Sequence, residues 1–209
     1  MTRIVGFGAA IVAVLFLAGI YVASTGWLVG TDGDRYAQCR SSTVAGGAGQ
    51  IGGPFELINA QGETVTDADV ITRPSILYFG YTFCPDVCPL DVARNAEAMD
   101  ILREDGHDVG GVFISVDPAR DTPEIVGEYA AIMHDEMLGL TGSEEQVQAA
   151  SRAYRTYYSV RETGDEFYLV DHSTFSYLVM PDAGFVEFFR REASPQEIAE
   201  RVSCFVEAA

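Results

Sequence analysis

Two short apolar segments constrain the fold of this 209-residue chain more than any other feature. They are SILYFGYTF (75–83) and GGVFISV (110–116), and neither contains a charged residue. Apolar runs of this length, rich in β-branched and aromatic residues, are typical of strands that are buried on both faces of a sheet. Between them lies PLDVARNAEAMDILRED (89–105), whose apolar residues have helical spacing. The pattern therefore predicts central strands of an α/β sheet that is covered by helices.

The segments on either side continue this alternation of strands and helices. They predict a hairpin at 54–66, helices at 122–136, 143–160 and 194–209, a short strand at 137–143, and strands meeting at a turn within 167–189. Asp121 or Thr122, Ser143 and Ser194 stand where helix N-caps are expected, and Pro123 suits a first helical position. The fold class that follows is α/β, with a mixed sheet flanked by helices.

The N-terminal part has a different character. Residues 4–30 carry no charge and are mostly apolar, with Arg3 before them and Asp32 and Asp34 after them. An apolar run of about 20 residues is long enough to cross a bilayer as one helix, and the flanking charges place the rest of the chain on the far side. The alternative is a cleaved secretory signal peptide. Either interpretation predicts that the folded part is exported.

Three regions follow from this reading of the chain. Residues 1–30 are predicted to be a membrane anchor, and residues 31–53, which include SSTVAGGAGQIGG, a flexible tether. Residues 54–209 form the folded domain. The formal net charge is −18, from 31 acidic residues and 13 basic residues that are all arginine. Such acidity argues against nucleic acid as a partner and suits cationic or metal partners, although a surplus of solvated carboxylates also simply favours solubility.

A pair of cysteines follows the first apolar segment, in FGYTFCPDVCPL (79–90). Cys84 is expected at the N-terminus of a helix, where the helix dipole stabilises a thiolate, and Pro85 suits the first helical position. Cys84 and Cys88 are then close enough to bind one ion or each other. Strand, cysteine pair and helix is the order of a thioredoxin-like domain, although the usual redox motif, C-x-x-C, has one residue fewer.

A histidine offers a third ligand to this pair. His107 and His134 lie in polar surroundings and are predicted to be exposed, whereas His172 lies at a break between apolar stretches. Two thiolates and an imidazole form a soft site that suits Cu(I) or zinc. The residues alone leave open that His172 is a loop histidine bonded to the backbone.

Three blocks of the sequence resemble signature blocks of the SCO/SenC family. They are FGYTFCPDVCP, VFISVDPARDTPE and VDHSTFSYLVMPDAGF, and GGPFEL at 52–57 resembles the start of that domain. Members are thioredoxin-like, membrane-anchored copper-binding proteins that assist assembly of the CuA centre of cytochrome c oxidase. The resemblance implies that Cys84, Cys88 and His172 bind copper, as Cu(I), Cu(II) or both. Phe83, which precedes the first cysteine, departs from the family pattern, because members frequently have a histidine at this position.

The same resemblance implies partners and a location. The partners are the copper-centre subunit of cytochrome c oxidase, other periplasmic copper carriers and thiol reductants, and the membrane through the N-terminal helix. The location is the inner membrane of a bacterium, with a single span and the domain in the periplasm. The expected function is delivery of copper to the CuA centre. The same thiols are also able to reduce cysteines of the recipient by thiol–disulfide exchange, and the sequence does not separate the two roles. The main alternative is a periplasmic thiol:disulfide oxidoreductase that uses Cys84 and Cys88; a peroxiredoxin-like peroxidase fits less well, and a redox or copper sensor stays open.

Other residues near these motifs have supporting roles. The resemblance places Asp86 and Asp171 around the site, where Asp171 either orients His172 or is a plain surface carboxylate. The segment from Asp117 to Pro123 is expected to have an architectural role. Outside the cytosol, Cys39 and Cys204 are predicted to form a disulfide; the alternative is a free Cys39 and a buried Cys204.

Overall fold

The computed structural model describes residues 16–17, 20, 34–42, 48–161 and 168–209. The chain divides into two compact units, Met1–Gln38 and Cys39–Ala209. Most of the predicted anchor lies outside the described residues; residues 16, 17 and 20 of it are helical. Within the described parts of the chain, no helix is both long enough and apolar enough to cross a membrane. The anchor at 1–30 and the boundaries of the tether stay predictions.

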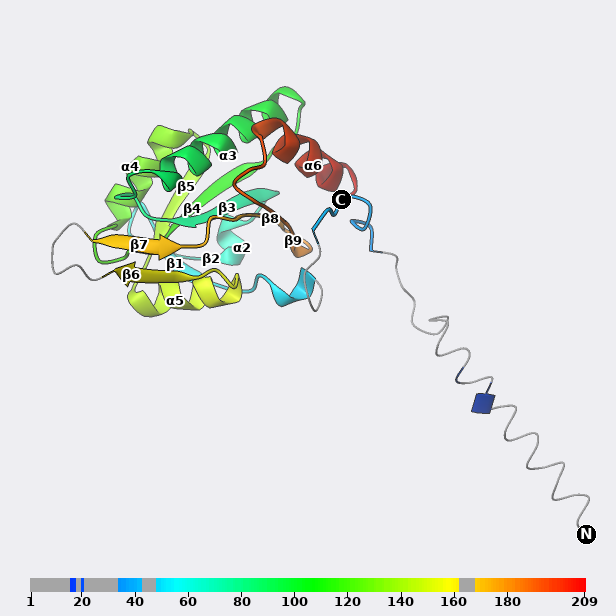
Figure 1. The fold of residues 1–209 in the computed structure, drawn as a ribbon, viewed down its shortest axis with the longest axis horizontal. Coiled ribbons are helices and arrows are strands. Elements are labelled where there is room, and N and C mark those ends of the chain that lie inside the picture. The colour runs from blue at the N-terminus through cyan, green and yellow to red at the C-terminus, as the bar shows by residue number, and fades with distance from the viewer. Residues whose placement is uncertain (1–15, 18–19, 21–33, 43–47, 162–167) are drawn as a thin grey trace, which may run out of the picture. The chain divides into compact units, whose positions relative to one another are not determined.

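The second unit is built on a seven-stranded mixed sheet (Figure 1). The strands run in the order β2-β1-β5-β4-β3-β8-β9. β3, β4 and β5 are parallel to one another, and the remaining pairs are antiparallel. The strands are β1 (Glu56–Asn59), β2 (Thr64–Thr66), β3 (Ser75–Gly80), β4 (Gly110–Ser115), β5 (Met137–Thr141), β8 (Ser176–Met180) and β9 (Gly184–Phe189).

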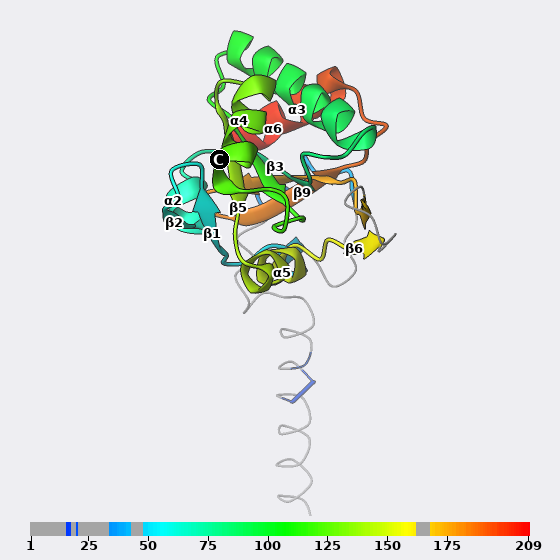
Figure 2. The ribbon, with the colours of Figure 1, turned by 90° about the vertical axis from the view of Figure 1, so that its left-hand side faces the viewer.

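Helices cover both faces of this sheet. The helical segments of the second unit are η1 (Ala48–Gln50), α2 (Asp67–Val70), α3 (Val87–Glu104), α4 (Pro123–Met133), α5 (Glu144–Ala153) and α6 (Pro195–Glu207), and the last four of these cover the sheet. Figure 2 shows α3, α4 and α6 on one side of the sheet and α5 on the other. The crossovers β3–α3–β4 and β4–α4–β5 advance in one direction, so right-handed connections place both helices on one face. The predicted α/β fold, a thioredoxin-like mixed sheet flanked by helices, is confirmed.

The two charge-free segments of the sequence form the centre of the sheet. All six residues of β3 and all six of β4 are buried. Phe79 on β3 and Phe113 on β4 are completely inaccessible to solvent. Each such side chain contributes about 1.5–3 kcal/mol of burial free energy, so these strands fix the position of whatever follows them. The cysteine pair follows β3 directly.

Three of the predicted helix starts are confirmed by their N-caps. The hydroxyls of Thr122, Ser143 and Ser194 accept hydrogen bonds from backbone N–H groups three residues later, at 3.4, 3.3 and 3.2 Å. Pro123 and Pro195 occupy the first turns of α4 and α6. These caps fix where α4, α5 and α6 begin because they satisfy N–H groups that have no partner inside the helix.

The prediction that one helix extends from 143 to 160 is wrong. α5 ends at Ala153, and Arg155 adopts a left-handed conformation (φ 51°) that ends the helix. Residues Tyr158–Arg161 then form β6, which pairs antiparallel with β7 (Leu169–His172). This pair is a separate two-stranded sheet. It carries His172 at its end.

The prediction that His134 is exposed is also wrong. It is buried at the end of α4, where its Nδ1 accepts a hydrogen bond from the Glu136 N–H (3.0 Å). Its Nε2 lies 3.3 Å from an Asp100 carboxylate oxygen and 3.2 Å from Arg103. His134 therefore caps this turn.

The disulfide between Cys39 and Cys204 is confirmed, with a Cα–Cα distance of 5.6 Å. It fastens residues 39–42 to α6. The completely buried carboxylate of Glu187, on β9, accepts hydrogen bonds from the backbone N–H groups of Ser41 (2.8 Å) and Ser42 (3.3 Å). The segment just before the folded domain is therefore held both covalently and by hydrogen bonds.

Candidate metal centre

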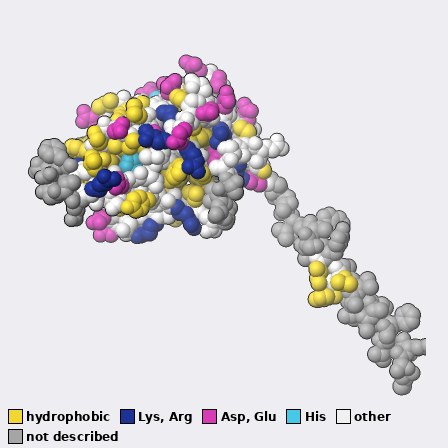
Figure 3. All heavy atoms as spheres, viewed as in Figure 1, with side chains coloured by type: hydrophobic (Ala, Val, Ile, Leu, Met, Phe, Trp, Pro, Cys, Tyr) yellow, Lys and Arg dark blue, Asp and Glu magenta, His cyan; other side chains and the backbone are white. Residues whose placement is uncertain are grey.

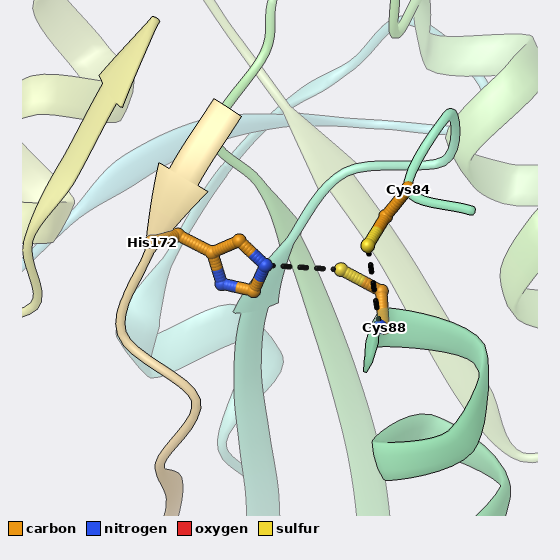
Figure 4. A group of neighbouring side chains, drawn as sticks. All are labelled: Cys84, Cys88 and His172. Carbon is orange, nitrogen blue, oxygen red and sulfur yellow. Dashed lines mark hydrogen bonds between the residues drawn. The ribbon is translucent and has the colours of Figure 1, made fainter. Parts of the chain in front are cut away.

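Cys84, Cys88 and His172 lie together at the end of β3 (Figure 4). Their ligand atoms, two sulfurs and one imidazole nitrogen, all lie within 4.8 Å of one another. Figure 4 shows the imidazole pointing at the Cys88 sulfur, and its Nε2 is 3.2 Å from that sulfur. Among the described residues, no other group of three or more histidine, cysteine or acidic side chains is arranged to bind a metal ion. The three candidate ligands come from segments that are 84 residues apart in the chain.

The two cysteines are positioned by the turn between β3 and α3. The Cys84 N–H donates to the Tyr81 carbonyl (3.3 Å), and the Cys88 N–H donates to the Cys84 sulfur (3.4 Å). Helix α3 begins at Val87, so the prediction that Pro85 is its first residue is wrong. Pro89 lies in its first turn instead, where a missing N–H costs nothing. Cys84 therefore lies just before the helix, and its sulfur accepts a hydrogen bond from the Cys88 N–H in the first turn of α3.

These contacts give the two sulfurs different acidities. The pKa of Cys84 is lowered to about 3, chiefly by a hydrogen bond with the Cys88 thiol, and also by His172 and by backbone amides, while burial opposes the shift. The pKa of Cys88 is raised, first because the same hydrogen bond with Cys84 favours its protonated form and then because it is buried. The pair titrates as a unit, with the first thiolate at Cys84.

Alkylation of Cys84 in the metal-free, reduced protein is predicted to depend little on pH. Between pH 7.5 and pH 5 an ordinary thiol loses thiolate, and hence reactivity, by roughly 300-fold. Because the pKa of Cys84 is lowered to about 3, its rate is expected to change less than about twofold. Timed iodoacetamide labelling with peptide mass mapping measures this. An alkylation rate that falls by roughly 300-fold between pH 7.5 and pH 5, as for an ordinary thiol, would contradict the low pKa of Cys84.

His172 is oriented by the backbone rather than by a carboxylate. Its Nδ1 donates to the Ser173 carbonyl (2.8 Å), so in the neutral ring Nε2 carries the lone pair that faces the cysteines. The ring stands edge-on to Tyr81 (5.8 Å, 90°) and Tyr78 (6.1 Å, 87°).

Asp171 instead pairs with Arg161 at 2.5 Å and is half exposed. The alternative of a surface carboxylate therefore describes Asp171, and a role in orienting His172 is wrong.

The remaining predicted residues lie around the turn. Asp86 is exposed at the N-cap of α3, and its side chain makes no capping hydrogen bond among the described residues. Asp121 is completely buried and accepts hydrogen bonds from the Ser115 hydroxyl (2.5 Å) and from the Thr82 hydroxyl (2.5 Å) and N–H (3.0 Å). Burial raises the pKa of Asp121. This carboxyl group joins the cysteine loop to β4, which is the architectural role expected of this segment.

Gly80 is a site residue that the sequence analysis missed. A β-carbon at this position would lie 2.9 Å from the Cys88 sulfur, 2.9 Å from Cε1 of Tyr78 and 3.1 Å from Cε2 of Phe113. Only a glycine therefore lets α3 bring Cys88 against the end of β3. A glycine inside an otherwise aromatic strand was the available signal, because it marks a close approach of another group.

A Gly80→Ala variant is predicted to be about 1–3 kcal/mol less stable than the native chain, because an added methyl group overpacks a rigid site. It should also displace the Cys88 sulfur. The free energy of unfolding in urea measures the first effect, and the alkylation profile of Cys84 measures the second. Gly62→Ala is a suitable comparison, because Gly62 has open space around it but needs a positive φ (76°); it should lose stability through backbone strain and leave the alkylation profile unchanged. An unchanged profile in Gly80→Ala would contradict the close-approach argument.

Comparison with known proteins agrees with the geometry. The sequence profile of the SCO1/SenC family matches residues 44–207. Protein SenC of Rhodobacter capsulatus is 54% identical over 200 residues, which cover 96% of this chain and 89% of that protein.

Two solved structures are also similar to this chain. The crystal structure of Arabidopsis thaliana ScoI with copper bound has 43% identity and a TM-score of 0.71, and the match covers 75% of this chain and 99% of that one. The structure of Bradyrhizobium japonicum ScoI with copper bound has 36% identity and a TM-score of 0.66, with 73% and 98% covered. A profile match over most of the chain, together with these relatives, shows that the chain belongs to the SCO1/SenC family.

Proposed function

We propose that this chain is a copper metallochaperone that delivers copper to the copper-centre subunit of a cytochrome c oxidase. One observation carries the proposal: two cysteine sulfurs and an imidazole nitrogen converge within 4.8 Å, in a chain that resembles two ScoI structures with copper bound. Copper is the cargo here, and Cys84, Cys88 and His172 are its ligands.

The chemistry of the three ligands suits Cu(I). Thiolates and imidazole are soft or intermediate donors, which favour Cu(I) over hard cations. Cys84 supplies a thiolate at neutral pH, and His172, whose Nδ1 donates to the Ser173 carbonyl, directs its Nε2 at the cysteines. Three ligands hold the ion while leaving a position for an incoming ligand of the recipient. The residues present therefore fit copper.

The surroundings of the site favour transfer to a protein partner. Phe83 and Leu90, which flank the cysteine pair, are 53% and 60% exposed. Figure 3 shows hydrophobic side chains gathered around a histidine on the face of the domain that carries β7. Exposed apolar side chains next to a metal site are suited to a protein contact. They support docking of the recipient against the site.

The same pair of cysteines supports a second function, reduction of a disulfide in the recipient. The Cys84 thiolate attacks a disulfide sulfur, the recipient's other sulfur leaves as a thiolate, and Cys88 then loses its proton and displaces the recipient's first sulfur. The recipient gains two electrons, and this chain gains a Cys84–Cys88 disulfide. The observation that favours this function is the lowered pKa of Cys84 beside a protonated Cys88. A disulfide sulfur is a poor ligand, so the same step releases copper.

The proposed location is the outer side of a bacterial inner membrane. The uncharged residues 4–30 support an anchor, and the Cys39–Cys204 disulfide is suited to an oxidising compartment. A topology reporter fused after Ala209 tests the location. Activity of a reporter that works only in the periplasm supports it, and activity of one that works only in the cytosol contradicts it.

Copper transfer tests the function. The full chain, purified in detergent and loaded with one Cu(I), is mixed with the metal-free copper-centre domain of an oxidase subunit, and copper in each protein is measured after separation. The account predicts transfer of copper to the recipient. Reduced, metal-free protein mixed with the oxidised domain tests the second function, with thiol trapping of the recipient as the readout. Copper that stays on a fully loaded chain would contradict delivery.

A further inference from the structure

Asp117, Arg120 and Tyr168 form a cluster between the segment after β4 and the start of β7. The Arg120 Nε donates to an Asp117 carboxylate oxygen (2.6 Å), and its Nη1 donates to the Tyr168 carbonyl (3.0 Å). The Tyr168 hydroxyl donates to the other oxygen of Asp117 (2.7 Å). The guanidinium carbon lies 3.6 Å from the centre of the Tyr168 ring. We call these three residues the clasp.

Arg120 also touches the cysteine side of the site. Its guanidinium lies 5.0 Å from the ring centre of Phe83, the residue before Cys84, and 5.7 Å from that of Tyr81. The Tyr81 ring in turn stands edge-on to the His172 ring. The Arg120 side chain is 15% exposed and that of Asp117 is 2% exposed, so the ion pair is well shielded from water. One side chain therefore contacts the segments that carry Cys84 and His172.

His172 needs such a fastening because β7 is not part of the main sheet. In the part of the chain that the structure describes, β7 pairs only with β6, in a separate two-stranded sheet. The cysteines, in contrast, are fixed by β3 and α3 inside the core. The distance between His172 and the cysteines thus depends on side-chain contacts along β7. In its middle the Tyr81 side chain hydrogen-bonds to the Val170 backbone, and the Tyr81 ring stands edge-on to His172. At the start of β7 these contacts are the clasp.

We propose that Arg120 is a positioning residue that keeps His172 within reach of the copper held by Cys84 and Cys88. The proposal rests on the proposed function and adds a mechanism to it: the clasp determines whether copper has three ligands or two. A lysine cannot replace Arg120, because two directed hydrogen bonds and a flat stack on Tyr168 require the planar guanidinium. Without the clasp, β7 moves away and the two sulfurs hold the ion alone.

A double-mutant cycle tests this mechanism. Cu(I) affinity is measured by competition with a chelator for the native chain, Arg120→Gln, His172→Ala and the double variant. The proposal predicts that Arg120→Gln weakens binding by about tenfold or more in the native background and by less than about twofold in the His172→Ala background. Arg152→Gln, an exposed arginine on α5 that contacts Gln148, is the matched control and should change nothing. Arg120→Lys should not restore binding.

Two results would overturn the proposal. Equal losses in both backgrounds would mean that Arg120 acts through the cysteines or through general stability, and no loss in the native background would mean that the clasp is irrelevant. If Arg120→Gln does not fold, Tyr168→Leu enters the same cycle, because it removes the stack and the hydroxyl hydrogen bond to Asp117 while Arg120 still pairs with the buried Asp117. Its expected effects have the same pattern.

A measurement without copper separates this proposal from the proposed function. In the metal-free protein, Arg120→Gln is predicted to speed amide hydrogen exchange in β7 by about tenfold while leaving β3 unchanged, because local opening costs less once the clasp is lost. Unchanged amide exchange in β7 of Arg120→Gln would overturn the proposed role of the clasp, even if the native chain carries copper. A native chain that binds no copper, with faster exchange in the variant, would contradict the function and retain the clasp.

Discussion

A Cys88→Ser variant is expected to bind Cu(I) more than about a thousandfold more weakly than the native chain, since a hard hydroxyl replaces a soft thiolate. Cys88 is completely buried, its sulfur lies 3.2 Å from the His172 Nε2, and its backbone N–H donates to the Cys84 sulfur at 3.4 Å. The substitution changes one atom and hardly changes the volume of the side chain, so the fold should be preserved. Competition with a Cu(I) chelator under reducing conditions measures the affinity.

The other two ligands define a graded series. Cys84→Ser should lose as much affinity as Cys88→Ser, and His172→Ala should lose about 10–100-fold, because two sulfurs still hold the ion. His107→Ala is the matched control, since His107 lies outside the cluster and faces Glu207 at 3.8 Å. A Cys88→Ser variant that stays within tenfold of the native affinity would contradict the assigned ligands.

Removing the Cys39–Cys204 disulfide is expected to have the largest effect on stability. The bond closes a loop of 165 residues, for which the chain-entropy model gives about 5 kcal/mol. In addition, the buried Glu187 carboxylate depends on the N–H groups of Ser41 and Ser42, which the disulfide holds in place. Once these donors leave, a buried charge loses hydrogen bonds. A Cys39→Ala/Cys204→Ala double variant should therefore lose about 3–5 kcal/mol in the free energy of unfolding.

Urea unfolding of the oxidised native chain and of the double variant measures this difference. Copper affinity serves as the internal control, because the metal centre uses none of these residues; it should change by less than about twofold in the folded variant. A difference in unfolding free energy below about 1 kcal/mol would show that residues 39–42 contribute little once the domain is folded.

The order of strands and helices was predictable because its causes are local. The charge-free runs at 75–83 and 110–116 became β3 and β4, and the serine and threonine caps marked the starts of three helices. The cysteine pair was placed correctly for the same reason, since it follows a buried strand directly. Pro85 was misplaced by two residues, because Pro89 is also compatible with a first helical turn.

The features that the sequence analysis missed depend on contacts between distant segments. The strand β6 exists because it pairs with β7. The sequence analysis assigned its residues to the preceding helix, which ends because Arg155 adopts a left-handed backbone conformation. The burial of His134 depends on Asp100 and Arg103 of another helix. Arg120 was predicted only as part of an architectural segment, and its contact with Tyr168 spans 48 residues. No local spacing encodes such contacts.

X-ray absorption spectroscopy of the reduced, Cu(I)-loaded full chain tests the central claim most directly, because it counts the atoms bound to the metal. The account predicts two sulfurs and one imidazole nitrogen in the native chain, and two sulfurs without the nitrogen in His172→Ala. A native spectrum with no imidazole contribution, or a spectrum that is identical in the two proteins, would contradict the site formed by Cys84, Cys88 and His172.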